Sequence, residues 1–295
     1  MIADDSRWSV SAYVDRLGAS RDDHPSVSGL HALHRAHVAR VPYETVWIWL
    51  DEPATVDPAA SAARIVAGRG GYCFQLNGAF SLLLNALGYQ VKLHAGGVTG
   101  RDSTEPVGAN GNHLVVTVHG LPGADAPQGE WLVDVGLGDA LYEPVPLRPG
   151  RYRQGAFVYR LSRSEVVPSG WRFDHDPAGC FGRMDFDPRP AVAADFAEMH
   201  QQLTTDPQSH FLRTITAQRR DEAGMYLLRG CVLNTVTGEG TVKKVYDTAS
   251  AWFDLLDGGF GLHLTDVDSA RRERLWARVS AAHHRWLSES TSTTR

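Results

Sequence analysis

The sequence predicts an α+β fold made of three consecutive units. Apolar residues recur at helical spacing over about Val10–Leu87, and the chain then changes to short β-branched segments separated by glycine, proline and aspartate. From about residue 190 helical and strand patterns are mixed. A chain of 295 residues is also about twice the usual domain length of roughly 150 residues. We therefore expect units at 1–88, 89–190 and 191–295.

The first unit contains three predicted helices. An apolar stripe with three- and four-residue spacing follows Ser26, which is a suitable N-cap. The alanine-rich run Pro58–Ala67 predicts the second helix. The third covers about Phe74–Leu87 and ends at Gly88, because glycine commonly terminates a helix.

Short strands dominate the second unit, and the third unit is mixed. The predicted strands of the second unit are Tyr89–Gly97, His113–His119, Glu130–Val135, Ala156–Leu161 and Trp171–Asp174. The third unit is predicted to contain helices at Ala191–Leu203, Ala249–Leu256 and Asp266–Leu287, and strands at Leu212–Gln218, Tyr226–Thr235 and Thr241–Val245. The polar tail 288–295 is predicted to be disordered.

Composition and charge exclude several classes of protein. The chain is 43% hydrophobic and 21% charged, which is ordinary for a globular protein. Its formal net charge of −5 argues against a dedicated nucleic-acid or anionic-membrane binder. The N-terminus lacks a basic stretch, and no apolar run approaches the ~20 residues needed to span a bilayer. We expect a soluble cytoplasmic protein.

Three cysteines are too few for a disulfide framework in a chain of this length. No CxxC pair is present, so they do not predict a zinc site, and their odd number is typical of a reducing compartment. His200, Asp206 and His210 match no zinc pattern either, and we predict no metal. Cys180 and Cys231 lack any feature of a helix start, and we expect inert buried thiols there.

Cys73 has surroundings that can make a thiol reactive. It follows Gly70 and Gly71 at the first turn of a predicted helix. Unpaired N–H groups and a partial positive charge at that position favour thiolate over thiol. Arg69 could add to this field. Taken alone, these features leave a buried apolar cysteine as the commoner alternative.

A nucleophilic thiolate needs a base, and the base needs an orienting group. His113 opens one predicted strand and Asp134 ends the next. If the chain between 119 and 130 connects the strands, 118 faces 131 and 113 faces 136, so His113 and Asp134 share a face. A slip of one residue would separate them. His119 is an alternative base, but it lies at the far end of its strand.

Several segments resemble the arylamine N-acetyltransferases, cysteine enzymes that move an acetyl group from acetyl-CoA to an aromatic amine or hydrazine. The matching motifs are Arg69–Cys73 with Gln75 and Asn77, Asn112–Val115, and Leu132–Gly138. The flanking segments Tyr13–Gly18, His31–Glu44 and Leu203–Phe211 fit as well. The sequence departs from the family at Tyr43, where phenylalanine is usual, at Leu137 for phenylalanine, and at 139–142. Gln75, where the family has glutamate or glutamine, lies within family variation but removes a charge beside Cys73.

The resemblance implies an N-terminal helical bundle carrying the nucleophile, a central antiparallel β-barrel carrying the histidine and aspartate, and a C-terminal α/β lid. It implies a cysteine-protease-like triad of Cys73, His113 and Asp134 that works by ping-pong transfer. Acetyl-CoA or another acyl-CoA is then a co-substrate, no cofactor is bound permanently, and the acceptor is an arylamine or arylhydrazine. Strand-end glycines are expected to border the cofactor cleft. They are Gly96, Gly97, Gly136 and Gly138.

Other functions remain open from the sequence. Related amide synthases use the same triad to release a carrier-bound acyl group, so an acyl carrier protein is an alternative donor. A transglutaminase-like cysteine hydrolase shares the chain order cysteine, histidine, aspartate. A non-catalytic descendant that binds acyl groups or a protein is a third alternative.

Overall fold

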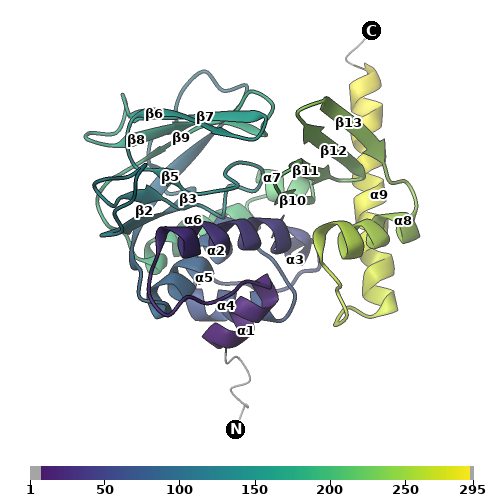
Figure 1. Ribbon diagram of the computed structural model, residues 1–295. Coiled ribbons are helices and arrows are strands. Elements are labelled where there is room, and N and C mark those ends of the chain that lie inside the picture. Colours follow the sequence, from purple (N-terminus) through teal and green to yellow (C-terminus); the bar gives the residue numbers. More distant parts are fainter. Residues whose placement is uncertain (1–7, 293–295) are drawn as a thin grey trace.

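Helices make up the first part of the chain in the computed structural model, which describes residues 8–292 (Figure 1). They are α1 (Val10–Leu17), α2 (Val27–Arg40), α3 (Val46–Trp49), α4 (Pro58–Val66) and α5 (Cys73–Ala86). Ser26 caps α2 and Asp57 caps α4 through side-chain oxygens that accept backbone N–H groups. Helix α5 is apolar nearly all round and is buried, as expected of a central helix.

Eight antiparallel strands form a nearly closed barrel in the order β5-β4-β3-β2-β9-β8-β7-β6. They are β2 (Gln90–Gly100), β3 (His113–His119), β4 (Trp131–Leu132), β5 (Val145–Pro146), β6 (Gly150–Gln154), β7 (Phe157–Arg163), β8 (Trp171–Asp174) and β9 (Phe181–Phe186). Val118 pairs with Trp131, which confirms the predicted register. Gln154 on β6 joins the two barrel edges, since its amide bonds the backbone of Tyr142 and Glu143 ahead of β5.

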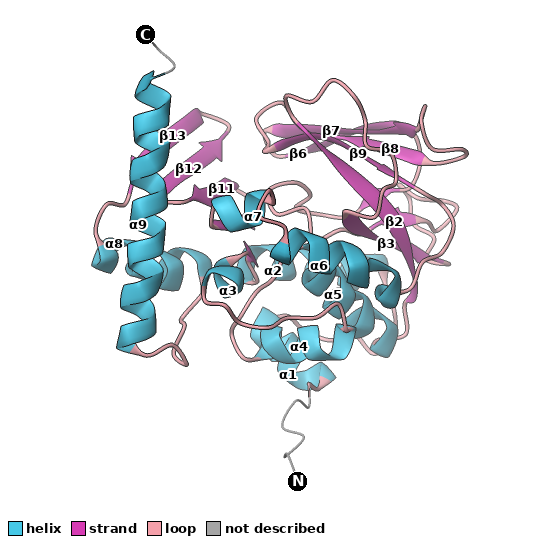
Figure 2. Cartoon of the chain, turned by 180° about the vertical axis from the view of Figure 1, so that it is seen from behind, coloured by secondary structure: helices cyan, strands magenta, loops and turns pink. Residues whose placement is uncertain are grey.

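A five-stranded antiparallel sheet in the order β1-β10-β11-β12-β13 forms the third part. Its strands are β1 (Tyr43–Glu44), β10 (Thr216–Arg220), β11 (Gly224–Arg229), β12 (Val232–Thr237) and β13 (Gly240–Val245). The accompanying helices are a 3-10 turn at Ala193–Phe196, α6 (Ala197–Thr205), α7 (His210–Arg213), α8 (Ala249–Asp254), a π-helical turn at Leu255–Gly259, and α9 (Ser269–Ser292). Figure 2 shows α9 running beside this sheet. Strand β1 comes from the first predicted unit but pairs in the sheet of the third. The boundaries expected at 88 and 190 therefore stay a prediction.

Three sequence-based expectations in the third part are wrong. The single strand predicted at Tyr226–Thr235 is a hairpin of β11 and β12, which turns at Gly230 with a φ of 58°. The first two residues of the strand predicted at Leu212–Gln218 belong to helix α7, and the observed strand β10 begins only at Thr216. The predicted disordered tail is helical as far as Ser292, and residues 293–295 lie outside the described part of the chain.

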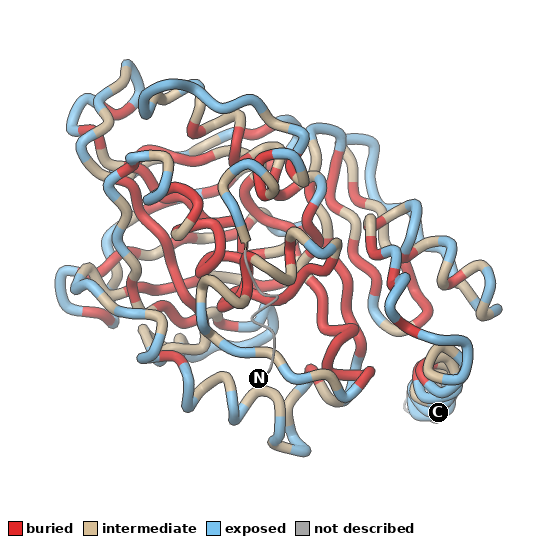
Figure 3. The backbone as a smooth tube through the Cα atoms, turned by 90° about the horizontal axis from the view of Figure 1, so that it is seen from below, coloured by how far each residue is buried: buried red, intermediate tan, exposed pale blue. Residues whose placement is uncertain are grey.

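Strand β3 separates two apolar cores, because its side chains point alternately to its two faces. Leu114, Val116 and Val118 face the larger core around α5, whereas Val115 faces the core inside the barrel. Both faces of this strand are therefore buried. Figure 3 shows that buried segments run through the middle of the molecule and that exposed segments lie mostly at its edge. This packing sets the distance between α5 and the start of β3. Among the described residues no helix is long and apolar enough to cross a membrane.

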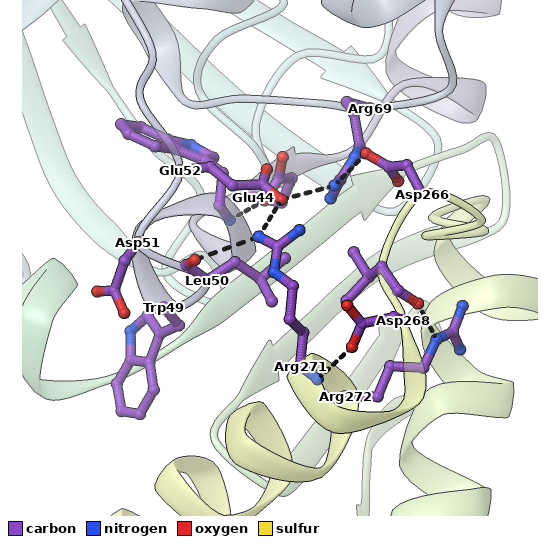
Figure 4. A network of polar contacts seen from close by, with 12 residues as sticks. Glu44, Trp49, Leu50, Asp51, Glu52, Arg69, Asp266, Asp268, Arg271 and Arg272 are labelled. Atoms are coloured by element: carbon purple, nitrogen blue, oxygen red, sulfur yellow. Dashed lines mark hydrogen bonds and ion pairs between the residues drawn. The ribbon is translucent and has the colours of Figure 1, made fainter.

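A network of ion pairs joins the start of α9 to the loop before Cys73 (Figure 4). The buried guanidinium of Arg69 pairs with Glu52 and Asp266, each at 2.9 Å. Arg271 also pairs with Glu52, at 2.9 Å. The charge of Arg69 is thus balanced by two carboxylates, and these ion pairs hold the loop before Cys73 against the third part of the fold.

Glu52→Ala should destabilise the protein by about 2–4 kcal/mol, because it leaves the buried Arg69 guanidinium short of a partner. Urea unfolding followed by tryptophan fluorescence measures this loss. Asp257→Ala is the control, because Asp257 pairs with His263 at an exposed site and should matter by less than about 1 kcal/mol. Equal effects of the two substitutions would contradict the structural role given to Arg69.

Candidate active site

Cys73 is the first residue of α5, and the chain before it is fixed by close backbone packing. Gly70 lies so close to Pro42 that a side chain could not be placed there. The Glu44 N–H donates to the carbonyl of Gly71 at 2.8 Å. Cys73 itself is only 4% exposed, and its sulfur faces a cavity. The nucleophile predicted from sequence therefore lies at a rigid helix start.

Gln75 holds the loop before Cys73 with both the oxygen and the nitrogen of its side-chain amide. Its carbonyl oxygen accepts the N–H of Tyr72 at 3.2 Å, and its Nε2 donates to the carbonyl of Thr55 at 2.9 Å. A glutamate could accept from Tyr72 but, when ionised, could not donate to Thr55. Only an amide at position 75 can therefore make both hydrogen bonds.

The three residues of the predicted triad meet where α5 approaches the barrel. The Nε2 atom of His113 lies 2.8 Å from Oδ2 of Asp134, and both side chains are buried. The Cys73 sulfur lies 3.7 Å from the carbonyl oxygen of Asn112, the residue before His113, and Cys73 acts electrostatically on the imidazole of His113. Since Nε2 is occupied by Asp134, Nδ1 is the ring nitrogen of His113 that is left for a contact with the sulfur.

Asn77 fixes the carboxylate of Asp134, a role that the sequence analysis did not assign. Its Nδ2 donates to Oδ1 of Asp134 at 2.7 Å and to the carbonyl of Leu114 at 2.6 Å. Its Oδ1 accepts the N–H of Val135 at 2.9 Å, while the Gly136 N–H also donates to Asp134. The spacing of four between Cys73 and Asn77, which puts both on one helix face, is the signal that could have revealed this.

The environment of His113 favours its charged form. Burial alone lowers the pKa of this imidazole, but the charges of Asp134 and Cys73 and the hydrogen bonds to both more than offset it. The net result raises the pKa of His113 to about 10. The histidine is therefore an imidazolium at neutral pH, which favours a thiolate–imidazolium pair.

His34 on α2 contacts the other side of the same segment. Its ring nitrogens lie 3.0 Å from the carbonyl of Tyr142 and 3.2 Å from the carbonyl of Asp134. Burial lowers the pKa of His34 to about 4, so this ring is neutral at pH 7. In the sequence, His34 falls on the apolar stripe that follows Ser26, and no local pattern distinguishes it.

The sulfur of Cys73 opens into a cavity of about 580 Å³ between the three parts of the fold. Its lining residues are Tyr43, Cys73, Val98, Gly100, Asn112, His113, Gly136, Leu137, Cys180, Phe181, Leu203, His210, Phe211, Thr214, Thr216, Gln218 and Arg229. Of the four glycines expected to border a cofactor, Gly136 lines this cavity, where a Cβ would come within 2.8 Å of the Cα of Cys73. Gly96, Gly97 and Gly138 do not line it and pack against other protein atoms.

Cys180 differs from the expected inert core thiol because it lines the same cavity as Cys73. Its Sγ donates to Oδ1 of Asp139 at 3.0 Å, and its N–H donates to the other carboxylate oxygen at 2.7 Å. Burial and the charge of Asp139 raise the pKa of Cys180 well above its usual value, so the thiol stays protonated. Cys231 is buried, as predicted.

The other histidines considered from sequence have different partners. His119 contacts Thr117 at 2.8 Å and is remote from Cys73 along β3. His200 shares a 2.6 Å hydrogen bond with the hydroxyl of Tyr72. Within the described part of the chain, no group of histidine, cysteine and carboxylate residues could hold a metal ion.

The fold and this site define a class: cysteine acyltransferases with a helical bundle, a barrel and a third α/β part. The sequence model of the N-acetyltransferase family matches residues 26–269, so the chain belongs to that family. It is 30% identical to an arylamine N-acetyltransferase of Mycolicibacterium smegmatis over 266 residues, 88% of this chain and 93% of the relative. It is 28% identical to an arylamine N-acetyltransferase / N-hydroxyarylamine O-acetyltransferase of Salmonella typhimurium over 289 residues, 92% and 95% of the two chains.

The structural comparison agrees with the sequence comparison. The solved arylamine N-acetyltransferase of Mycobacterium marinum in complex with CoA superimposes with a TM-score of 0.80 at 27% identity. The match covers 93% of this chain and 99% of that one. The present chain is thus an acyltransferase of the arylamine N-acetyltransferase type, as the resemblance implied.

Histidine NMR should distinguish the two buried rings. Between about pH 6 and 9 the ¹⁵N shifts should show His113 as imidazolium and His34 as neutral imidazole, because their pKa values lie near 10 and 4. Asp134→Asn should lower the pKa of His113, since the opposing charge is lost and the burial remains. Asp139→Asn, which removes a buried carboxylate paired with His175, is the control and should leave His113 charged.

Gln75→Glu should cost about 2–4 kcal/mol of stability, because a buried carboxylate replaces the donor to Thr55. Guanidinium unfolding at pH 7 measures this cost. Asn85→Asp makes the same amide-to-acid change at an exposed position of α5 and serves as the control. If the two variants lost equal stability, the structural reason given for the amide of Gln75 would be wrong.

Proposed function

We propose that this enzyme transfers an acetyl group from acetyl-CoA to arylamines or arylhydrazines by a ping-pong mechanism through a Cys73 thioester. The observation that carries the proposal is the buried chain Cys73–His113–Asp134, which ends at a cavity large enough for small substrates. CoA is the proposed donor, rather than a carrier protein, because a relative of similar structure has been solved with CoA.

In the first half of the proposed reaction, the Cys73 thiolate attacks the thioester carbonyl. The negative charge that develops on the carbonyl oxygen is stabilised by the unpaired N–H groups at the start of α5. The carbon–sulfur bond to CoA then breaks, and the imidazolium of His113 gives its proton to the departing CoA thiolate. The products are acetylated Cys73, free CoA and a neutral His113.

In the second half, the amine nitrogen attacks the acetyl carbonyl on Cys73. The neutral His113 takes the proton that the nitrogen loses, and the Cys73 thiolate departs, which restores the ion pair. Asp134, held by Asn77, keeps the ring of His113 in orientation through both halves. The proposed catalytic residues are therefore Cys73, His113 and Asp134. Gly136 borders the substrate cavity, whereas Gly96, Gly97 and Gly138 pack against other parts of the protein.

Intact-mass spectrometry should show one acetyl group on the protein after mixing with acetyl-CoA, and this adduct should disappear when an arylamine is added. Cys73→Ala should form no adduct, whereas the control Cys231→Ala should behave as the unmodified protein, because Cys231 is buried outside the cavity. Asp134→Asn should slow acylation on the order of 10²–10⁴-fold by disturbing His113. An adduct lost to water as fast as to amine would instead indicate a hydrolase.

A further inference from the structure

One face of the five-stranded sheet forms a wall of the active-site cavity. Tyr43 on β1 pairs with Gln218 on β10, and Thr216 on β10 pairs with Arg229 on β11. Residues two apart on a strand share a face, so all four side chains lie on the same side of this sheet. All four line the cavity that contains Cys73.

The hydroxyl of Tyr43 is available to a ligand. Within the described residues it makes no hydrogen bond to the protein, although the side chain lines the cavity. Burial, followed by the nearby charges of Cys73 and Cys180, raises the pKa of Tyr43 well above its usual value. The phenol therefore keeps its proton and stands within electrostatic reach of the reacting sulfur, as a hydrogen-bond donor without a protein acceptor.

Arg229 supplies the second donor of this wall. Its guanidinium forms no ion pair or hydrogen bond within the described part of the chain, and no aspartate or glutamate lines the cavity. The positive charge of Arg229 lowers the pKa of Tyr43 and of Cys180, against the rise that burial causes. The guanidinium therefore acts on groups inside the cavity, although the residue is also exposed to solvent. A guanidinium presents a planar fork of N–H donors that matches a carboxylate.

We propose that Tyr43 and Arg229 form a carboxylate-binding subsite in the active-site cavity, which selects substrates that carry a carboxylate near the reacting group. This inference rests on the function proposed above. The carboxylate belongs either to the acyl group of the donor or to the amine acceptor. The phosphates of CoA fit less well, because the whole pantetheine arm separates them from the thioester, whereas Tyr43 is close to Cys73.

The test compares matched pairs of charged and neutral substrates. Acetyl-CoA and succinyl-CoA form the donor pair, and aniline and 4-aminobenzoate form the acceptor pair. In Arg229→Gln the kcat/KM of the charged member should fall on the order of 10- to 100-fold more than that of its neutral partner, in one of the two pairs. Tyr43→Phe should show a smaller loss in the same pair, and the pair that responds identifies which substrate carries the carboxylate.

Control variants keep the outcome interpretable. Arg213→Gln removes the same charge from an exposed arginine that does not line the cavity, and it should leave both selectivity ratios unchanged. Arg229→Lys should retain part of the preference. Equal losses for charged and neutral substrates would overturn the proposal. The proposal would also be overturned if Arg229→Gln lowered kcat/KM with acetyl-CoA but not with S-acetylpantetheine, because Arg229 would then bind the phosphates of the donor.

The two proposals fail in different ways. If no acyl-CoA leaves an adduct on Cys73 in the unmodified protein, the proposed function is wrong. If the adduct forms and is passed to amines without any preference for a carboxylate in either pair, only the subsite is wrong. Thermal unfolding of each variant shows whether a lost rate reflects lost folding, and Tyr43→Phe removes no more than one hydroxyl group.

Discussion

The buried carboxylate of Asp134 is the constraint on which the arrangement of the site depends. A buried carboxylate without donors would cost several kcal/mol. Here the donors come from separate elements: Asn77 from α5, His113 from β3, and Gly136 from the loop after β4. Satisfying this one group therefore fixes the helix, the strand and the loop relative to one another. Cys73 lies one turn before Asn77, so the same constraint brings the sulfur to the imidazole.

Burial lowers the pKa of both His113 and His34, yet the His113 ring is charged at neutral pH and the His34 ring is neutral. Both are close to Asp134, but His113 contacts its carboxylate and His34 contacts its backbone carbonyl. A full negative charge overcomes the desolvation of an imidazolium, whereas two carbonyl dipoles do not. The protonation state of a buried histidine is thus decided by the kind of group it faces. This is why an imidazolium and a neutral imidazole can lie on two sides of one residue.

The local part of the site could be predicted from the sequence, and its long-range part could not. The register of β3 and β4 follows from strand alternation once the chain between 119 and 130 is taken as their connection, and it places His113 and Asp134 on one face. The hairpin at Gly230 was missed because a single glycine interrupts an otherwise continuous apolar and β-branched stretch. The pairing of Arg69 with Asp266 joins residues nearly two hundred positions apart, and no local pattern encodes such a contact. The resemblance to a known family supplied the barrel and the lid, which periodicity alone did not.

The two-residue strand β1 connects the loop before Cys73 to the proposed carboxylate subsite. On one side the N–H of Glu44 bonds the carbonyl of Gly71, two residues before Cys73. On the other side Tyr43 pairs with Gln218 of the five-stranded sheet. The wall of the cavity is therefore held at a fixed distance from the nucleophile, although it comes from a different part of the fold. Side chains on β10 and β11 can change without disturbing the donors of Asp134, because none of those donors lies on that sheet. The fold can in this way keep one acyl-transfer chemistry while its substrate preference varies.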